Sequence, residues 1–100
     1  MRLTPEQAAI IRSAAAEAFG SDARVWLFGS RVDDAKRGGD IDLYVETSQT
    51  SGDAVPRQLR FWSLLQQKLG EPRIDIVMRP MGSPSQPIHE IARLTGVPLA

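Results

Sequence analysis

Two aspartates separated by one residue are the first side chains in this sequence that could do chemistry. Asp40 and Asp42 lie in the alternating segment 40–45, in which every second residue is isoleucine, leucine or valine. This period of two predicts a strand that carries both carboxylates on one face, about 7 Å apart at their Cα atoms. Mg²⁺ is a hard cation that prefers oxygen ligands, so such a pair could hold one ion or bridge two. A solvated strand edge is the alternative if the pair is taken alone.

A possible phosphate-binding turn comes before these aspartates. Gly29 and Ser30 follow the apolar run 25–28, which is typical of a buried strand, and lead into a polar segment. Glycine lets the backbone approach a phosphate closely, and the serine hydroxyl and free backbone N–H groups add donors. Arg31 could contact the same phosphate. Alternatively, Ser30 only caps a turn at the end of the strand, and Arg31 is an ordinary surface arginine.

A third carboxylate is predicted at Asp75, which alternates with Ile74 and Ile76. If its strand lies beside that of Asp40 and Asp42, three acidic groups meet. Asp75 could then ligate a metal and help to deprotonate an attacking hydroxyl. The alternative is an ion pair with Arg73 or Arg79.

The elements that must position these residues can be predicted from apolar periodicity and from caps. Helices are expected from Thr4 to Gly20, from Pro56 to about Leu69 and from Pro87 to about Leu94, and strands over 25–28, 40–45 and 73–78. This order predicts an α+β fold, with a small mixed sheet and helices packed on one side. Helix periodicity predicts two buried stripes: Ile11, Ala14, Ala15, Ala18 and Phe19 in the first helix, and Leu59, Trp62, Leu65 and Leu69 in the second.

Four ring-bearing side chains allow further expectations. Trp26 and Trp62 are interpreted as core residues. Phe61 and Trp62 are neighbours on one helix, so both cannot face the same core, and one of them could be exposed to a partner. His89, in the first turn of the last helix, is expected to be exposed or to cap that helix.

Composition narrows the classes of function. The chain has 100 residues, expected to form a single domain over 1–100, with 12 basic and 12 acidic residues and no cysteine. Zero net charge argues against broad nucleic-acid binding, and the lack of cysteine excludes disulfides and thiolate metal sites. Neither a membrane-spanning run nor the apolar core of a signal peptide is present, so a cytoplasmic protein without membrane contact is expected.

The motifs together resemble a known family. Leu27-Phe28-Gly29-Ser30, nine residues, and then Asp40-Ile41-Asp42-Leu43 are similar to the signature of the DNA-polymerase-β-like nucleotidyltransferase superfamily, and Arg73-Ile74-Asp75-Ile76-Val77 matches its third-carboxylate strand. The short length and the segment 88–99 resemble the minimal nucleotidyltransferases. The likeness covers nearly the whole chain.

That resemblance implies a fold, an activity and a partner. The fold would be the nucleotidyltransferase palm. Members transfer a nucleoside monophosphate from a nucleoside triphosphate, such as ATP, to a hydroxyl with one or two Mg²⁺ ions, and they release pyrophosphate. Gly29, Ser30 and Arg31 would bind the nucleotide phosphates, and Asp40, Asp42 and Asp75 would be catalytic metal ligands. Minimal nucleotidyltransferases typically act as antitoxins of HEPN-domain toxins, and some adenylylate a tyrosine of that toxin.

Three functions are therefore compared. The first is Mg²⁺-dependent adenylyl transfer to a hydroxyl of a HEPN toxin, and the second is a non-catalytic antitoxin that neutralises its partner by forming a complex. The third is nucleotidyl transfer to a small molecule such as an antibiotic. The sequence shows no second domain that would bind a small acceptor, which counts against the third. The three carboxylates favour the first over the second.

Overall fold

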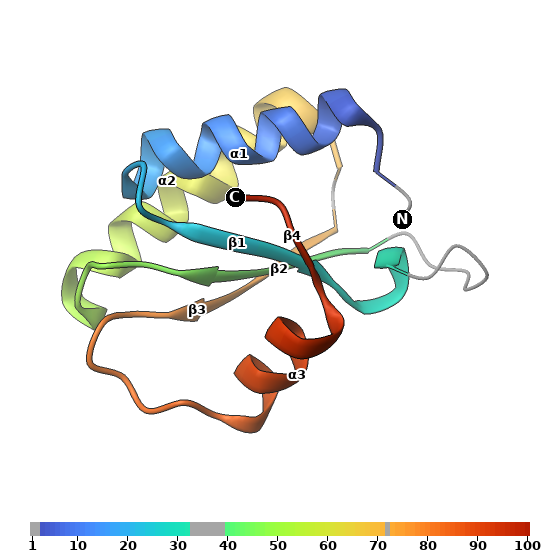
Figure 1. Ribbon diagram of the computed structural model, residues 1–100. Coiled ribbons are helices and arrows are strands. Elements are labelled where there is room, and N and C mark those ends of the chain that lie inside the picture. Colours follow the sequence, from blue (N-terminus) through green and yellow to red (C-terminus); the bar gives the residue numbers. More distant parts are fainter. Residues whose placement is uncertain (1–2, 33–39, 72) are drawn as a thin grey trace.

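The computed structural model describes residues 3–32, 40–71 and 73–100, and Figure 1 shows their arrangement. The helices are α1 (Pro5–Phe19), α2 (Ser51–Leu69) and α3 (Pro87–Thr95), with a short 3₁₀ turn, η1, at Gly29–Val32. The strands are β1 (Arg24–Phe28), β2 (Ile41–Glu46), β3 (Ile74–Arg79) and the two-residue β4 (Val97–Pro98). The predicted α+β fold with a mixed sheet is confirmed. No helix of the described residues is both long and apolar enough to cross a bilayer.

The four strands form one sheet in the order β3-β2-β1-β4. β1 pairs antiparallel with β2 and β4, whereas β2 and β3 are parallel. A parallel pair needs a crossover connection, and here α2 provides it between β2 and β3. The register sets Phe28 opposite Asp42 and Asp42 opposite Asp75, so these three residues form one row across the sheet.

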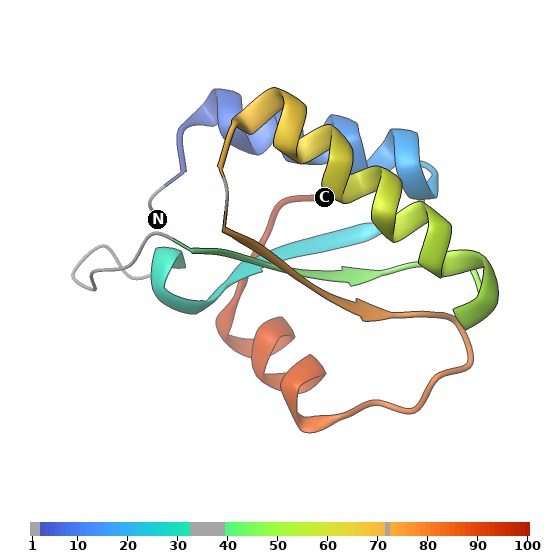
Figure 2. The ribbon, with the colours of Figure 1, turned by 180° about the vertical axis from the view of Figure 1, so that it is seen from behind.

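The larger core lies between the sheet and the pair of helices α1 and α2, which lie together on one face (Figures 1 and 2). α1 begins with the predicted capping box, in which Thr4 and Gln7 bond each other's backbone N–H groups. All five residues of the stripe predicted for α1 are buried. The rings of Phe19 and Phe61 meet edge to face at 5.3 Å between centroids and join the two helices.

The expectation that helices cover only one side of the sheet was wrong. α3 packs on the opposite face, as Figure 2 also shows, against a second apolar cluster of Trp26, Tyr44 and Ala92. Tyr44 shares the face of Asp42, as its position in the strand predicts, but it is fully buried beneath α3. This face is therefore polar at one end, around Asp42, and apolar in the middle.

The second helix also differs from its prediction. α2 begins at Ser51, five residues before Pro56, and the backbone carbonyl of Thr50 accepts the N–H groups of Asp53 and Ala54. Pro56 lies inside the helix, where it leaves the carbonyl of Gly52 without its usual donor. The buried side chains are Ala54, Phe61 and Leu65, whereas Leu59 and Trp62 are exposed. Of the two neighbouring aromatic residues, Trp62 is thus the exposed one.

Candidate active site

The two central carboxylates of the site come from neighbouring parallel strands. Asp42 on β2 and Asp75 on β3 are direct register partners, and each alternates with residues that point into the larger core. Paired positions on adjacent strands lie about 4.8 Å apart and direct their side chains to the same face. The predicted juxtaposition of the Asp75 strand with the Asp42 strand is therefore confirmed.

The pKa of the Asp42 carboxyl is affected by the acidic groups around it. Burial raises the pKa of the Asp42 carboxyl above its usual value of 3.8, and the negative charges of Asp75 and then Asp40 raise it further. A hydrogen bond between the side chains of Asp42 and Asp75 acts in the same direction. Carboxylates that repel one another in this way are stabilised by a bound cation.

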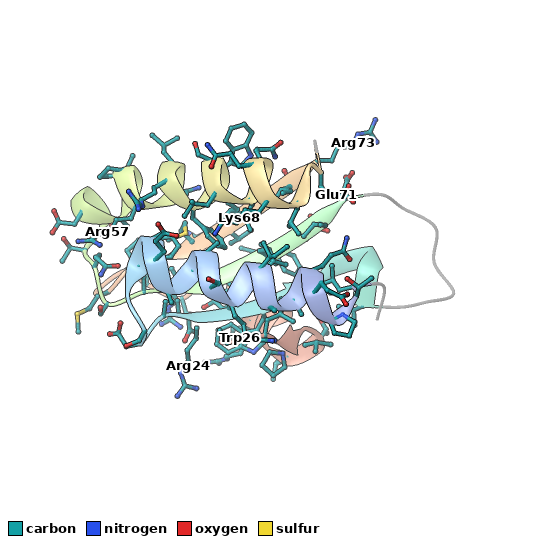
Figure 3. The ribbon with its side chains drawn as sticks, turned by 90° about the horizontal axis from the view of Figure 1, so that it is seen from above. Arg24, Trp26, Arg57, Lys68, Glu71 and Arg73 are labelled. Carbon is teal, nitrogen blue, oxygen red and sulfur yellow. The ribbon has the colours of Figure 1, made fainter. Side chains whose placement is uncertain are left out.

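Asp40 occupies a more open position than predicted. β2 begins at Ile41, so Asp40 lies one residue before the strand rather than within it. Its carboxylate lies 3.9 Å from the guanidinium of Arg73, and both side chains are largely exposed, so this ion pair contributes little to stability. Figure 3 shows Arg73 projecting outward beyond the end of α2. The charge of Asp40 still reaches Asp42 and raises the pKa of that carboxyl.

The predicted phosphate-binding turn lies directly against Asp42. Gly29 has φ +79°, a backbone conformation that favours glycine, and a Cβ at this position would lie 2.2 Å from Oδ2 of Asp42. Only a residue without a side chain allows the backbone and the carboxylate to approach so closely. The backbone of Ser30 and Arg31 continues the 3₁₀ turn. Their phosphate contacts remain predictions, because their side chains lie outside the described part of the structure.

Two of the three predicted carboxylate ligands lie close enough together to bind one magnesium ion. Within residues 3–32, 40–71 and 73–100, no three histidine, aspartate or glutamate side chains are arranged around a common metal position. Mg²⁺, however, is usually held by one or two carboxylates, with water and substrate phosphates completing its shell. Asp42 and Asp75 supply such a pair, and Asp40 would need to turn toward them to join it.

Beneath α3, the same face of the sheet is closed by stacked rings. The ring of Tyr44 lies 5.2 Å from that of Trp26 and 5.5 Å from that of His89, centroid to centroid. Burial, followed by a hydrogen bond donated to Glu46, raises the pKa of Tyr44 to about 12, so its hydroxyl stays protonated. His89 caps α3, as one of its two interpretations predicts, because Nδ1 accepts the backbone N–H of Gln86. It is buried rather than exposed.

A groove beside Asp75 was missed by the sequence reasoning. It has a volume of about 390 Å³ and is lined by Gln58, Leu59, Trp62, Ile74, Asp75 and Ile76. It lies between α2 and β3, the strand at one edge of the sheet. The available signal was the apolar spacing of Leu59 and Trp62, which indicates burial but not what buries them.

Comparison with known protein families gives a match over most of the chain. A family model described as "Nucleotidyltransferase domain" matches residues 9–95, a span that includes Gly29, Asp40, Asp42 and Asp75. No curated protein matches the chain significantly.

Proposed function

Because the chain belongs to the nucleotidyltransferase domain family, we propose that it is a cytoplasmic, Mg²⁺-dependent enzyme that transfers AMP from ATP to a hydroxyl of a partner protein. One observation carries this proposal. Asp42 and Asp75 form an in-register carboxylate pair, and the backbone of Gly29 lies against the first of them. Two oxygen ligands and a close glycine turn are what a metal–triphosphate site requires.

Each of the described site residues would have its own role in the transfer. Asp42 and Asp75 would hold the metal, with Asp40 beside them, and the Gly29 turn would receive the triphosphate through its backbone. When bound, Mg²⁺ supplies positive charge that polarises the phosphoryl oxygens and offsets the charge of the leaving pyrophosphate. Asp75 would accept the proton of the acceptor hydroxyl as that oxygen bonds to the α-phosphorus.

We further propose that the acceptor is a HEPN-domain toxin and that this chain is its antitoxin. The resemblance to minimal nucleotidyltransferases supports this partner. The structure adds an exposed apolar surface next to Asp75, formed by Leu59 and Trp62 of α2. Exposed apolar patches beside a site are typical of protein-binding surfaces.

The same exposed surface also suits the second candidate, an antitoxin that binds without turnover. Mass spectrometry of the intact partner protein distinguishes these two candidate functions. The protein encoded by the gene next to this one, which is the candidate partner, is mixed with this chain, ATP and Mg²⁺. The mass of that protein is then measured. A gain of one or more AMP units supports transfer, whereas a stable complex with unchanged mass supports occlusion.

Magnesium is expected to stabilise the free protein, because the ion relieves the repulsion among Asp40, Asp42 and Asp75. The melting temperature should rise with added MgCl₂ and should respond much less in the double variant Asp40→Asn/Asp42→Asn. Calorimetry at matched ionic strength, with NaCl as the control salt, makes the comparison. An equal rise in wild type and variant would contradict a metal site at these residues.

A further inference from the structure

Three large apolar side chains form a stripe on the outer surface of α2. Val55, Leu59 and Trp62 follow the i, i+4, i+7 spacing of one helix face, and their exposed fractions are 58%, 63% and 44%. A stripe of this spacing is normally buried. Here the core is filled instead by Ala54, Phe61 and Leu65 from the neighbouring face of the helix.

The stripe borders the site rather than a remote surface. Leu59 and Trp62 form one wall of the groove, and Ile74, Asp75 and Ile76 of β3 form the other. Asp75 borders the groove from the edge strand, while its carboxylate lies with that of Asp42 on the face of the sheet opposite α2. A segment that seats one side chain in the groove and continues around the edge of β3 would bring a neighbouring hydroxyl to that pair.

The sheet order separates two directions of approach to the carboxylates. β2, with Asp42, lies between β3 and β1, and Gly29 directly follows β1. The glycine turn thus reaches Asp42 from the β1 side, whereas the groove reaches Asp75 from the β3 side. One side suits the triphosphate, and the other remains for the second substrate.

The chemistry of the groove selects its occupant. Its lining consists of four apolar residues, one glutamine and one aspartate, and none of these described lining residues is cationic. A triphosphate or a nucleic-acid backbone would find no cation among them to balance its negative charge. An apolar side chain would bury its surface against Leu59, Trp62 and Ile76 without such a cost.

We infer that this groove is the acceptor subsite, and that it binds a large apolar side chain of the partner protein next to the hydroxyl that is modified. The inference rests on the proposed transfer to a protein hydroxyl, and it assigns Leu59 and Trp62 a role in acceptor specificity. Binding there fixes the hydroxyl beside Asp75, which lowers the entropic cost of the reaction.

The test compares a groove variant with a matched surface variant. Leu59→Ser/Trp62→Ala removes the wall, and Ile91→Ser/Leu94→Ser removes two exposed apolar side chains from α3, which are 54% and 79% exposed and do not line the groove. With the neighbouring gene's protein as acceptor, the groove variant should raise the acceptor KM at least about tenfold, the lower end of the effect of burying one large side chain. The KM for ATP should stay unchanged, and the α3 variant should match wild type.

The affinity of the complex tests the groove independently of catalysis. In the Asp42→Asn background, measured without ATP so that no transfer occurs, the Kd for the same protein should still rise at least about tenfold in the groove variant. This result would uphold the groove as the site that binds the partner protein even if no AMP were transferred. A wild-type Kd in the groove variant, an equal loss in the α3 variant, or no binding by wild type would overturn it. So would a raised KM for ATP, or a wild-type homodimer that the groove variant converts to monomer.

Discussion

Replacing Asp42 by asparagine is expected to lower kcat for nucleotidyl transfer by about 100-fold or more, because substitutions one shell further out already cost about 10- to 100-fold in metal sites. Asp42 is the carboxylate on which the proposed site converges, since it pairs with Asp75 across the strands and contacts the Gly29 turn. Asparagine keeps the shape of the side chain but removes its charge. The measurement is single-turnover transfer at saturating ATP and Mg²⁺.

The same substitution is expected to stabilise the free protein. Burial and the charges of Asp75 and Asp40 raise the folded-state pKa of Asp42, so its ionisation at neutral pH opposes folding. In metal-free buffer at pH 7, the melting temperature of the variant should therefore lie above that of wild type, which calorimetry can measure. Loss of activity together with a lowered melting temperature would instead indicate a structural defect.

The pH dependence of this stability difference has a definite sign. A raised folded-state pKa contributes stability below the unfolded value of about 3.9, and that contribution is lost as the pH rises through the folded-state pKa. Asparagine has no such term. In metal-free buffer, the stability difference between Asp42→Asn and wild type should be small near pH 4 and should widen toward pH 7. A difference that is constant with pH would contradict the raised pKa.

Replacing Gly29 by alanine is expected to lower transfer about as severely as Asp42→Asn does. The added Cβ would lie 2.2 Å from Oδ2 of Asp42, so the carboxylate must turn away from its position beside Asp75. The backbone φ of +79° adds strain of about 1–2 kcal/mol for any residue with a side chain. Both kcat and the melting temperature should fall.

Gly70→Ala provides the matched control for that experiment. Gly70 ends α2 with φ +68°, and a Cβ there would meet no atom within 4 Å. This variant carries the backbone strain alone, so it should lose a similar amount of stability but keep its activity. Equal activity in the two variants would show that the contact between Gly29 and Asp42 has no role in transfer.

Many of the helix and strand positions could be predicted from local sequence patterns. The alternation around Asp42 and Asp75 placed both on strands, and the capping box of Thr4 and Gln7 fixed the start of α1. The predicted limits of β1, β3 and α3 were within one residue of the observed ones. These features depend on neighbours in sequence, so they can be read without knowledge of the fold.

What could not be predicted depends on distant partners. Of the stripe predicted for α2, Leu65 is buried and Leu69 is partly buried against the core, but Leu59 and Trp62 are exposed. Phe61 faces the core instead. Periodicity gives the faces of a helix and not their orientation. Likewise, nothing local to α3 shows that it covers Tyr44, because that contact joins residues 44 and 89 across the sheet. β4 is two residues long and is defined only by its pairing with β1.

The crossover that joins β2 to β3 has a consequence for how the site comes into being. Asp42 and Asp75 are neighbours only because α2 returns the chain to the sheet, and Gly29 reaches them through a third strand. No hairpin or other local fragment contains the assembled row. The proposed site is therefore a late product of folding, so a nascent or partly unfolded chain would have neither metal affinity nor turnover.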